Sequence, residues 1–132
     1  MTPTQSSTPM QVIESVYAAF QRGDVAAILS QVAPNASWRE YESLPWGGTY
    51  TGPEGAAEFF LKLAAVMQTI AFEPRENIVA GNEVFTVGEY EGKSVKTGKT
   101  ARVRWMFRWR VEGGKIVAWD GHLDSAPLVA IL

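Results

Sequence analysis

The sequence has no cysteine, a single histidine and no long apolar run. Without cysteine the chain cannot form disulfides, cysteine-zinc sites or cysteine nucleophiles. The lone histidine, His122, excludes any site built from several imidazoles. No apolar run approaches the roughly 20 residues of a membrane-spanning helix, and a net charge of −2 provides no basic field for nucleic acid or an anionic membrane. We therefore expect neither nucleic acid nor a membrane as partner.

The chain has 132 residues, of which 46% are hydrophobic and 20% charged, as in an ordinary globular domain. Residues 1–8 are polar and lack the basic region and apolar stretch of a signal peptide. We expect a disordered tail over residues 1–8, one domain over residues 9–132, and a cytoplasmic location. The chain carries no nucleotide, flavin or haem motif and no metal-ligand motif, so we expect no cofactor and no metal.

Three segments in the first half have the apolar spacing of helices. The first begins at a capping box over residues 8–11 and ends at Gly23. The second follows directly and is stopped by residues 34–35. The third begins at residues 51–54 with a proline at its first turn, and its apolar positions continue to Met67.

The other segments alternate apolar and polar residues, which only a strand places on opposite faces. Strands are predicted over residues 36–42, 70–80, 83–91, 102–111 and 116–124. Residues 44–52 and 92–94 are predicted as loops. Pro74 lacks a backbone N–H, which favours an edge strand or a bulge there.

This order of elements resembles the nuclear transport factor two-like superfamily, in particular its ketosteroid-isomerase and SnoaL-like polyketide-cyclase branches. The residues that carry the resemblance are 16–24 (VYAAFQRGD), 44–55 (LPWGGTYTGPEG), Phe59-Phe60, Gly114-Lys115-Ile116 and Leu123-Asp124. The resemblance implies an α+β fold, a cystatin-like roll in which a cone-shaped, curved antiparallel sheet with a mixed edge wraps around three helices. It also implies a cavity between the sheet and the helices, and a homodimer formed through the outer sheet face.

Glu40 is the first candidate catalytic residue, because the resemblance places it where the isomerases carry a carboxylate base. Trp38 precedes it by two residues and should face the same cavity. A carboxylate among aromatic rings loses hydration, which raises its pKa toward the range useful for proton transfer; ketosteroid isomerase is a known example of such tuning. The alternative is a glutamate at a strand end, in solvent or in an ion pair.

His122 and Asp124 are further catalytic candidates, because Asp120 and Asp124 flank the only histidine and could form an acid–base relay with it. The resemblance, however, turns His122 outward unless a bulge reverses the strand, and Asp124 could instead cap a terminal helical turn. The donor pair that stabilises the oxyanion in the isomerases falls near Val16 and Trp105 and is not reproduced.

Large aromatic side chains are the expected ligand-binding residues. Tyr17 lies one position from the tyrosine of the isomerases and either reaches the cavity or packs in the core with its hydroxyl bonded. The tryptophans either fill the core or also leave a slot for a flat apolar ligand. The expected ligand-binding residues are Tyr17, Trp38, Trp46, Trp105, Phe107 and Trp119.

Four arginines occupy the opposite face of the 102–111 strand. Acidic residues on neighbouring strands can pair with them, which favours an ion-paired outer face at a dimer interface over nucleic-acid binding. The arginines are 102, 104, 108 and 110, and the expected acidic partners are Glu89, Glu91, Asp120 and Asp124.

The sequence therefore supports two hypotheses. In the first, a pocket binds a small apolar organic molecule, and Glu40 performs cofactor-independent chemistry of the isomerase, cyclase or hydrolase type. In the second, the chain is a non-catalytic ligand-binding or dimerisation module. Catalysis requires a pocket carboxylate with a second polar group within hydrogen-bond reach, whereas binding alone does not.

Overall fold

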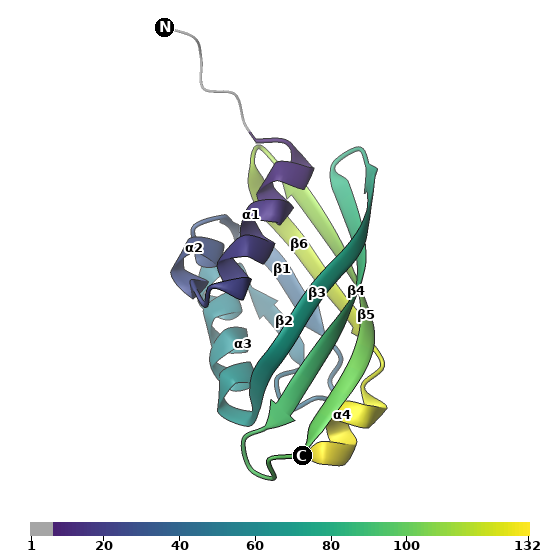
Figure 1. Cartoon of the computed structure of the whole chain (residues 1–132). Helices are drawn as coiled ribbons and strands as arrows, with labels where there is room; N and C mark the ends of the chain where they lie inside the picture. The colour runs from purple at the N-terminus through teal and green to yellow at the C-terminus, as the bar shows by residue number, and fades with distance from the viewer. Residues whose placement is uncertain (1–6) are drawn as a thin grey trace, which may run out of the picture.

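The computed structural model describes residues 7–132, so the tail predicted over residues 1–8 lies mostly outside the described residues (Figure 1). The elements follow in the order α1 (Pro9–Gln21), α2 (Val25–Leu29), β1 (Val32–Glu40), β2 (Gly48–Thr51), α3 (Gly52–Val66), β3 (Met67–Ala80), β4 (Glu83–Ser94), β5 (Thr100–Glu112), β6 (Lys115–Leu123) and α4 (Ala126–Ile131).

The six strands form one curved sheet in the order β2-β1-β6-β5-β4-β3, and α1, α2 and α3 gather on one side of it (Figure 1). Strand β1 runs parallel to β6 and antiparallel to β2, so the sheet is antiparallel except next to one edge. The predicted α+β roll with a mixed edge is confirmed. Among residues 7–132, no helix has the length and apolar character needed to cross a membrane.

Local signals explain where the helices begin. At α1 the Thr8 hydroxyl accepts from the Gln11 amide at 3.2 Å, and the Gln11 side chain accepts from the Thr8 amide at 3.0 Å. At α2 the Asp24 carboxylate accepts from the Ala27 amide at 3.1 Å. The reciprocal cap at α1 and the single cap at α2 satisfy backbone N–H groups that the first turn of a helix leaves without a partner.

Several predicted boundaries are wrong because strand pairing overrides the local pattern. Strand β1 begins at Val32, which pairs with Ile116, so residues 34–35 lie in a strand and do not stop a helix. The predicted loop over residues 44–52 contains β2, which pairs with β1. Met67 begins β3 and does not continue the helix, and the predicted loop over residues 92–94 is the end of β4.

The prediction that Pro74 lies in an edge strand is confirmed. Strand β3 is the last strand of the sheet, and its register against β4 shifts between Pro74 and Glu76. The missing N–H of proline is tolerated there because an edge strand has one unpaired side.

The alternation of β5 is as predicted. Trp105 and Trp109 are buried, whereas Arg102 and Arg104 are exposed on the other face. The outer arginines form ion pairs across the sheet. The pairs are Arg102 with Glu73, Glu89 and Glu91, and Arg108 with Glu83 and Asp120.

Candidate functional site

The inner sides of β1, β6 and β5 place aromatic side chains in a row across the sheet. Trp38 pairs with Trp119, which in turn pairs with Trp109. The next inner positions along β6 and β5 are the paired residues Gly121 and Phe107. Side chains two residues apart on a strand share a face, so Glu40 lies beside Trp38 on this inner face.

Glu40 is the acidic group of this surface. Its exposed fraction is 7%, and one carboxylate oxygen accepts the Tyr41 amide at 2.9 Å. Burial raises the pKa of Glu40 to about 7, and the Tyr41 hydrogen bond opposes this rise only in part. The adjacent Arg39 points to the other face and pairs with Asp120, so it does not counteract the burial.

Gly121 creates the space for this carboxylate. A Cβ atom at this position would lie 2.6 Å from Glu40 Oε2 and 2.7 Å from the Trp119 ring. Both distances are shorter than the contacts that Cβ atoms make in real proteins. The position of the Glu40 carboxylate therefore depends on glycine at this point of β6. A glycine within a strand often marks such a close approach.

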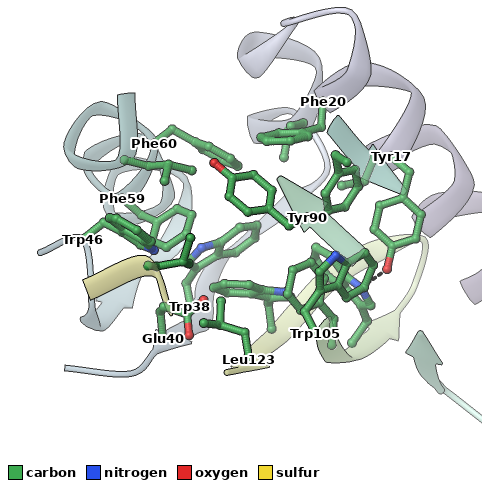
Figure 2. A pocket seen from close by; sticks show the side chains of 18 residues that line it. Tyr17, Phe20, Trp38, Glu40, Trp46, Phe59, Phe60, Tyr90, Trp105 and Leu123 are labelled. Carbon is green, nitrogen blue, oxygen red and sulfur yellow. Dashed lines mark hydrogen bonds between the residues drawn. The ribbon is translucent and has the colours of Figure 1, made fainter. Parts of the chain in front are cut away.

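The inner face and the helices enclose a cavity of about 80 Å³. Its lining is almost entirely apolar and aromatic, and Glu40 is the one carboxylate in it among the described residues. Figure 2 shows Glu40 beside Trp38 and Leu123, with Tyr17 at the opposite end of the pocket. Because a cavity of roughly 150 Å³ is needed to hold benzene, an aromatic ligand fits only if lining side chains move.

A second hollow of about 500 Å³ adjoins this cavity, between α1, α3 and β3. The two share four wall residues, Phe20, Phe60, Leu63 and Phe72, all half-buried. The rings of Phe20 and Phe72 have centroids 4.8 Å apart. These four side chains form the shared wall between the hollow and the cavity.

Three indole N–H groups of the lining have no acceptor among the described residues, although they are buried. They belong to Trp38, Trp105 and Trp119, whose exposed fractions are 2%, 3% and 3%. A buried donor without a partner costs about 1–3 kcal/mol. The three N–H groups lie within the packed wall, and the surface of the cavity itself is almost entirely apolar.

Tyr17 lines the cavity with its ring, but its hydroxyl is occupied. The Trp109 indole donates to it at 2.9 Å. Burial raises the pKa of Tyr17 to about 12, so the phenol stays protonated at neutral pH. This bond ties α1 to the sheet.

The predicted relay of His122 and Asp124 is not brought into the cavity. His122 is exposed on the outer face, where its Nδ1 lies 2.9 Å from the Tyr41 hydroxyl. The register from Trp105–Leu123 to Trp109–Trp119 is unbroken, so no bulge turns His122 inward. Asp124 is exposed, and Ser125, not Asp124, occupies the N-cap position of α4.

Trp46, Trp105, Phe107 and Trp119 all line the cavity, as does Trp38. Sequence reasoning missed Tyr90 and Phe72, although Tyr90 has the inner-face parity of its predicted strand. Within residues 7–132, no group of three or more histidine, aspartate or glutamate side chains is placed to hold a metal ion.

A family model described as the SnoaL-like domain matches residues 13–119, which include nearly all the cavity-forming elements. The chain belongs to the SnoaL-like domain family. No match was found among curated proteins.

Solved structures of similar proteins have the same fold as this chain. An NTF2-like protein from Burkholderia thailandensis is 32% identical, with a TM-score of 0.89 over 95% of this chain and 97% of that chain. The protein TerC, co-crystallised with polyporic acid, is 28% identical, with a TM-score of 0.84 over 95% and 98% of the two chains. A protein from Catenulispora acidiphila with a ketosteroid isomerase-like fold, in complex with trimethylamine, is 18% identical, with a TM-score of 0.80 over 95% and 93%.

Proposed function

We propose that the cavity binds a small apolar organic molecule and that Glu40 moves a proton on it without a cofactor. The observation that carries this proposal is the burial of Glu40 in an apolar cavity, with a pKa raised to about 7. The co-crystallisation of the similar protein TerC with polyporic acid supports a small organic ligand.

The chemistry follows from the two forms of Glu40. At neutral pH the carboxylate and the carboxylic acid are both well populated, because the pKa is close to the pH. The carboxylate accepts a proton from an acidic C–H bond, and the resulting acid returns it to another atom of the same molecule. Such a transfer within one molecule is an isomerisation, and the same base can initiate ring closure.

The rival function is ligand binding without turnover. The observation that favours it is the size of the cavity, about 80 Å³, which the protein's own aromatic rings nearly fill. In that case Glu40 is a hydrogen-bonding group for the ligand and performs no proton transfer.

Glu40→Gln distinguishes the two functions, because it keeps the shape of the side chain and removes the base. The wild-type protein should accelerate exchange of α-protons of small aromatic ketones in deuterated buffer, and Glu40→Gln should slow this exchange about 100-fold. The measurement is loss of the α-proton NMR signal over time. Glu42→Gln, an exposed carboxylate two residues away, is the matched control and should exchange at the wild-type rate. Equal rates in the wild type and Glu40→Gln would favour the binding module.

We also propose that the protein forms a homodimer through its outer sheet face, as expected from the resemblance. The cytoplasmic location stays a prediction. Met106 and Val87 pair on neighbouring strands of that face, with exposed fractions of 44% and 39%. They form an apolar centre between the ion pairs of Arg102 and Arg108. Apolar centres within a polar rim are typical of protein interfaces.

Sedimentation at micromolar concentration should show a dimer. Met106→Glu should shift the protein to the monomer, because a carboxylate would be buried at the two-fold interface. Leu61→Glu, a change at a side chain of α3 with an exposed fraction of 73%, is the control and should leave the dimer intact. A wild-type monomer, or a dimer that Met106→Glu does not weaken, would contradict this assignment.

A further inference from the structure

We infer that Gly121 is a positioning residue for the proton transfer, and that Oε2 of Glu40, the oxygen lying over it, is the atom that takes up and releases the proton. This inference rests on the proposed proton transfer by Glu40 and deepens it. The observation behind it is the close approach of the carboxylate to β6, where a Cβ atom on Gly121 would lie 2.6 Å from Oε2.

The carboxylate of Glu40 extends from β1 toward the neighbouring strand β6. The register of these two parallel strands brings Glu40 beside Gly121. The inner positions before and after Gly121 carry the large side chains of Trp119 and Leu123, both of which line the cavity. Gly121 is therefore the gap in this row of β6 into which a carboxylate can extend.

The two oxygens of the carboxylate have different surroundings. Oε1 accepts the Tyr41 amide N–H at 2.9 Å, whereas Oε2 of Glu40 has no hydrogen-bond partner among residues 7–132. An amide N–H needs an acceptor lone pair, so it favours Oε1 as the carbonyl oxygen of the neutral acid. The proton of the acid form then resides on Oε2, the oxygen above Gly121.

A side chain at position 121 would displace this oxygen. The new Cβ atom would also lie 2.7 Å from the Trp119 ring. That ring is packed against Trp38 and Phe107, with centroid distances of 4.8 and 5.1 Å, whereas the carboxylate is the end of a flexible side chain. The carboxylate is therefore the group that moves, and a misplacement of about 1 Å can cost about 100-fold in rate.

The test is the Gly121→Ala variant of the full chain, with two measurements. The first is the exchange of the α-protons of acetophenone in deuterated buffer. The second is the titration of the Glu40 carboxyl carbon, followed by NMR in ¹³C-labelled protein without any ketone. The second measurement reports on the carboxylate whether or not the protein turns over the ketone.

Gly121→Ala should slow the exchange at least tenfold. The pKa of Glu40 should rise above its wild-type value of about 7, because the displaced group loses the Tyr41 hydrogen bond and stays among apolar rings. Gly55→Ala is the control for crowding alone. Its Cβ would lie 2.9 Å from the Tyr50 Cβ, on a different element, and it should exchange at the wild-type rate.

Double variants show whether Gly121 acts through the carboxylate. In the Glu40→Gln background, Gly121→Ala should have no further effect on exchange, since the base is already absent. Glu40→Asp shortens the side chain and leaves room for the new methyl group, so adding it to Gly121→Ala should raise the urea concentration needed for unfolding. If Gly121→Ala does not fold, a folded double variant supports the inference and an unfolded one contradicts it.

Unchanged exchange and an unchanged Glu40 titration in Gly121→Ala would overturn this inference and leave proton transfer by Glu40 standing. An effect of Gly121→Ala on exchange that persists in the Glu40→Gln background would also overturn it, since the change would then act through the cavity wall. Absence of exchange in the wild type would contradict the proposed function and, with it, the role of Oε2 in proton transfer.

Discussion

Replacing Glu40 by glutamine should stabilise the protein by about 3 kcal/mol at pH 8 and change its stability little at pH 4. The pKa of Glu40 is about 7 in the folded protein against an ordinary value of 4.5. Because the folded pKa is raised, the folded state binds more protons than the unfolded state between these two values. The penalty is therefore absent below pH 4.5, grows as the pH rises, and is complete above pH 7.

Glutamine is the suitable replacement because its carbonyl oxygen still accepts the Tyr41 amide while the side chain stays neutral. Urea unfolding at a series of pH values measures the difference between the two proteins. Glu42→Gln, at an exposed position, should reproduce the wild-type pH dependence. If the wild type and Glu40→Gln lose stability in parallel from pH 4.5 to 7, Glu40 is not a buried proton-binding group.

The opposed faces of β5 could be predicted because the period of a strand is a local property of the sequence. Alternation between arginines and aromatics is enough to assign Trp105 and Trp109 to the inside. The inner position of Glu40 could be predicted in the same way from its parity with Trp38. Glu40 and Trp38 are both buried in the structure, although the catalytic role of Glu40 stays a prediction.

Non-local contacts explain what the sequence did not reveal. Strand β2 has only four residues, and its conformation depends on pairing with β1. The missing Cβ of Gly121 provides the space for Glu40, and this close approach between β6 and β1 is not visible in any local pattern. The unbonded indole of Trp105 and the bonded indole of Trp109 look alike in sequence, because the difference depends on whether Tyr17 lies opposite.

The hydrogen bonds also distinguish the polar side chains of the lining that stabilise the fold from those that have no partner. The hydroxyl of Tyr17 accepts the hydrogen bond of the Trp109 indole and supports the packing of α1 on the sheet. The indoles of Trp38 and Trp119 have no such partner, and they lie beside the carboxyl group. Near α1 the side chains of Tyr17 and Trp109 bond to each other, whereas the indole of Trp105, also next to Tyr17, has no partner.

Trp38→Ala should destabilise the protein by about 3–5 kcal/mol, the cost typical of deleting a large buried aromatic side chain. Trp38 has an exposed fraction of 2%, and its ring contacts four others. The centroid distances are 5.9 Å to Phe59, 5.8 Å to Phe60, 5.7 Å to Trp109 and 4.8 Å to Trp119. Alanine would leave these rings around a void that the curved sheet and α3 cannot close without moving.

Arg39→Ala is the matched control, because the neighbouring side chain lies on the opposite face and is 64% exposed. Its ion pair with Asp120 should contribute at most about 1 kcal/mol. Trp38→Phe should fall between the two, since it keeps a ring and removes a donor that has no partner. Urea denaturation of the three variants at one pH measures the order. A loss in Trp38→Ala no larger than that in Arg39→Ala would mean that the Trp38 ring does not belong to the core, and the cavity built around it would have to be abandoned.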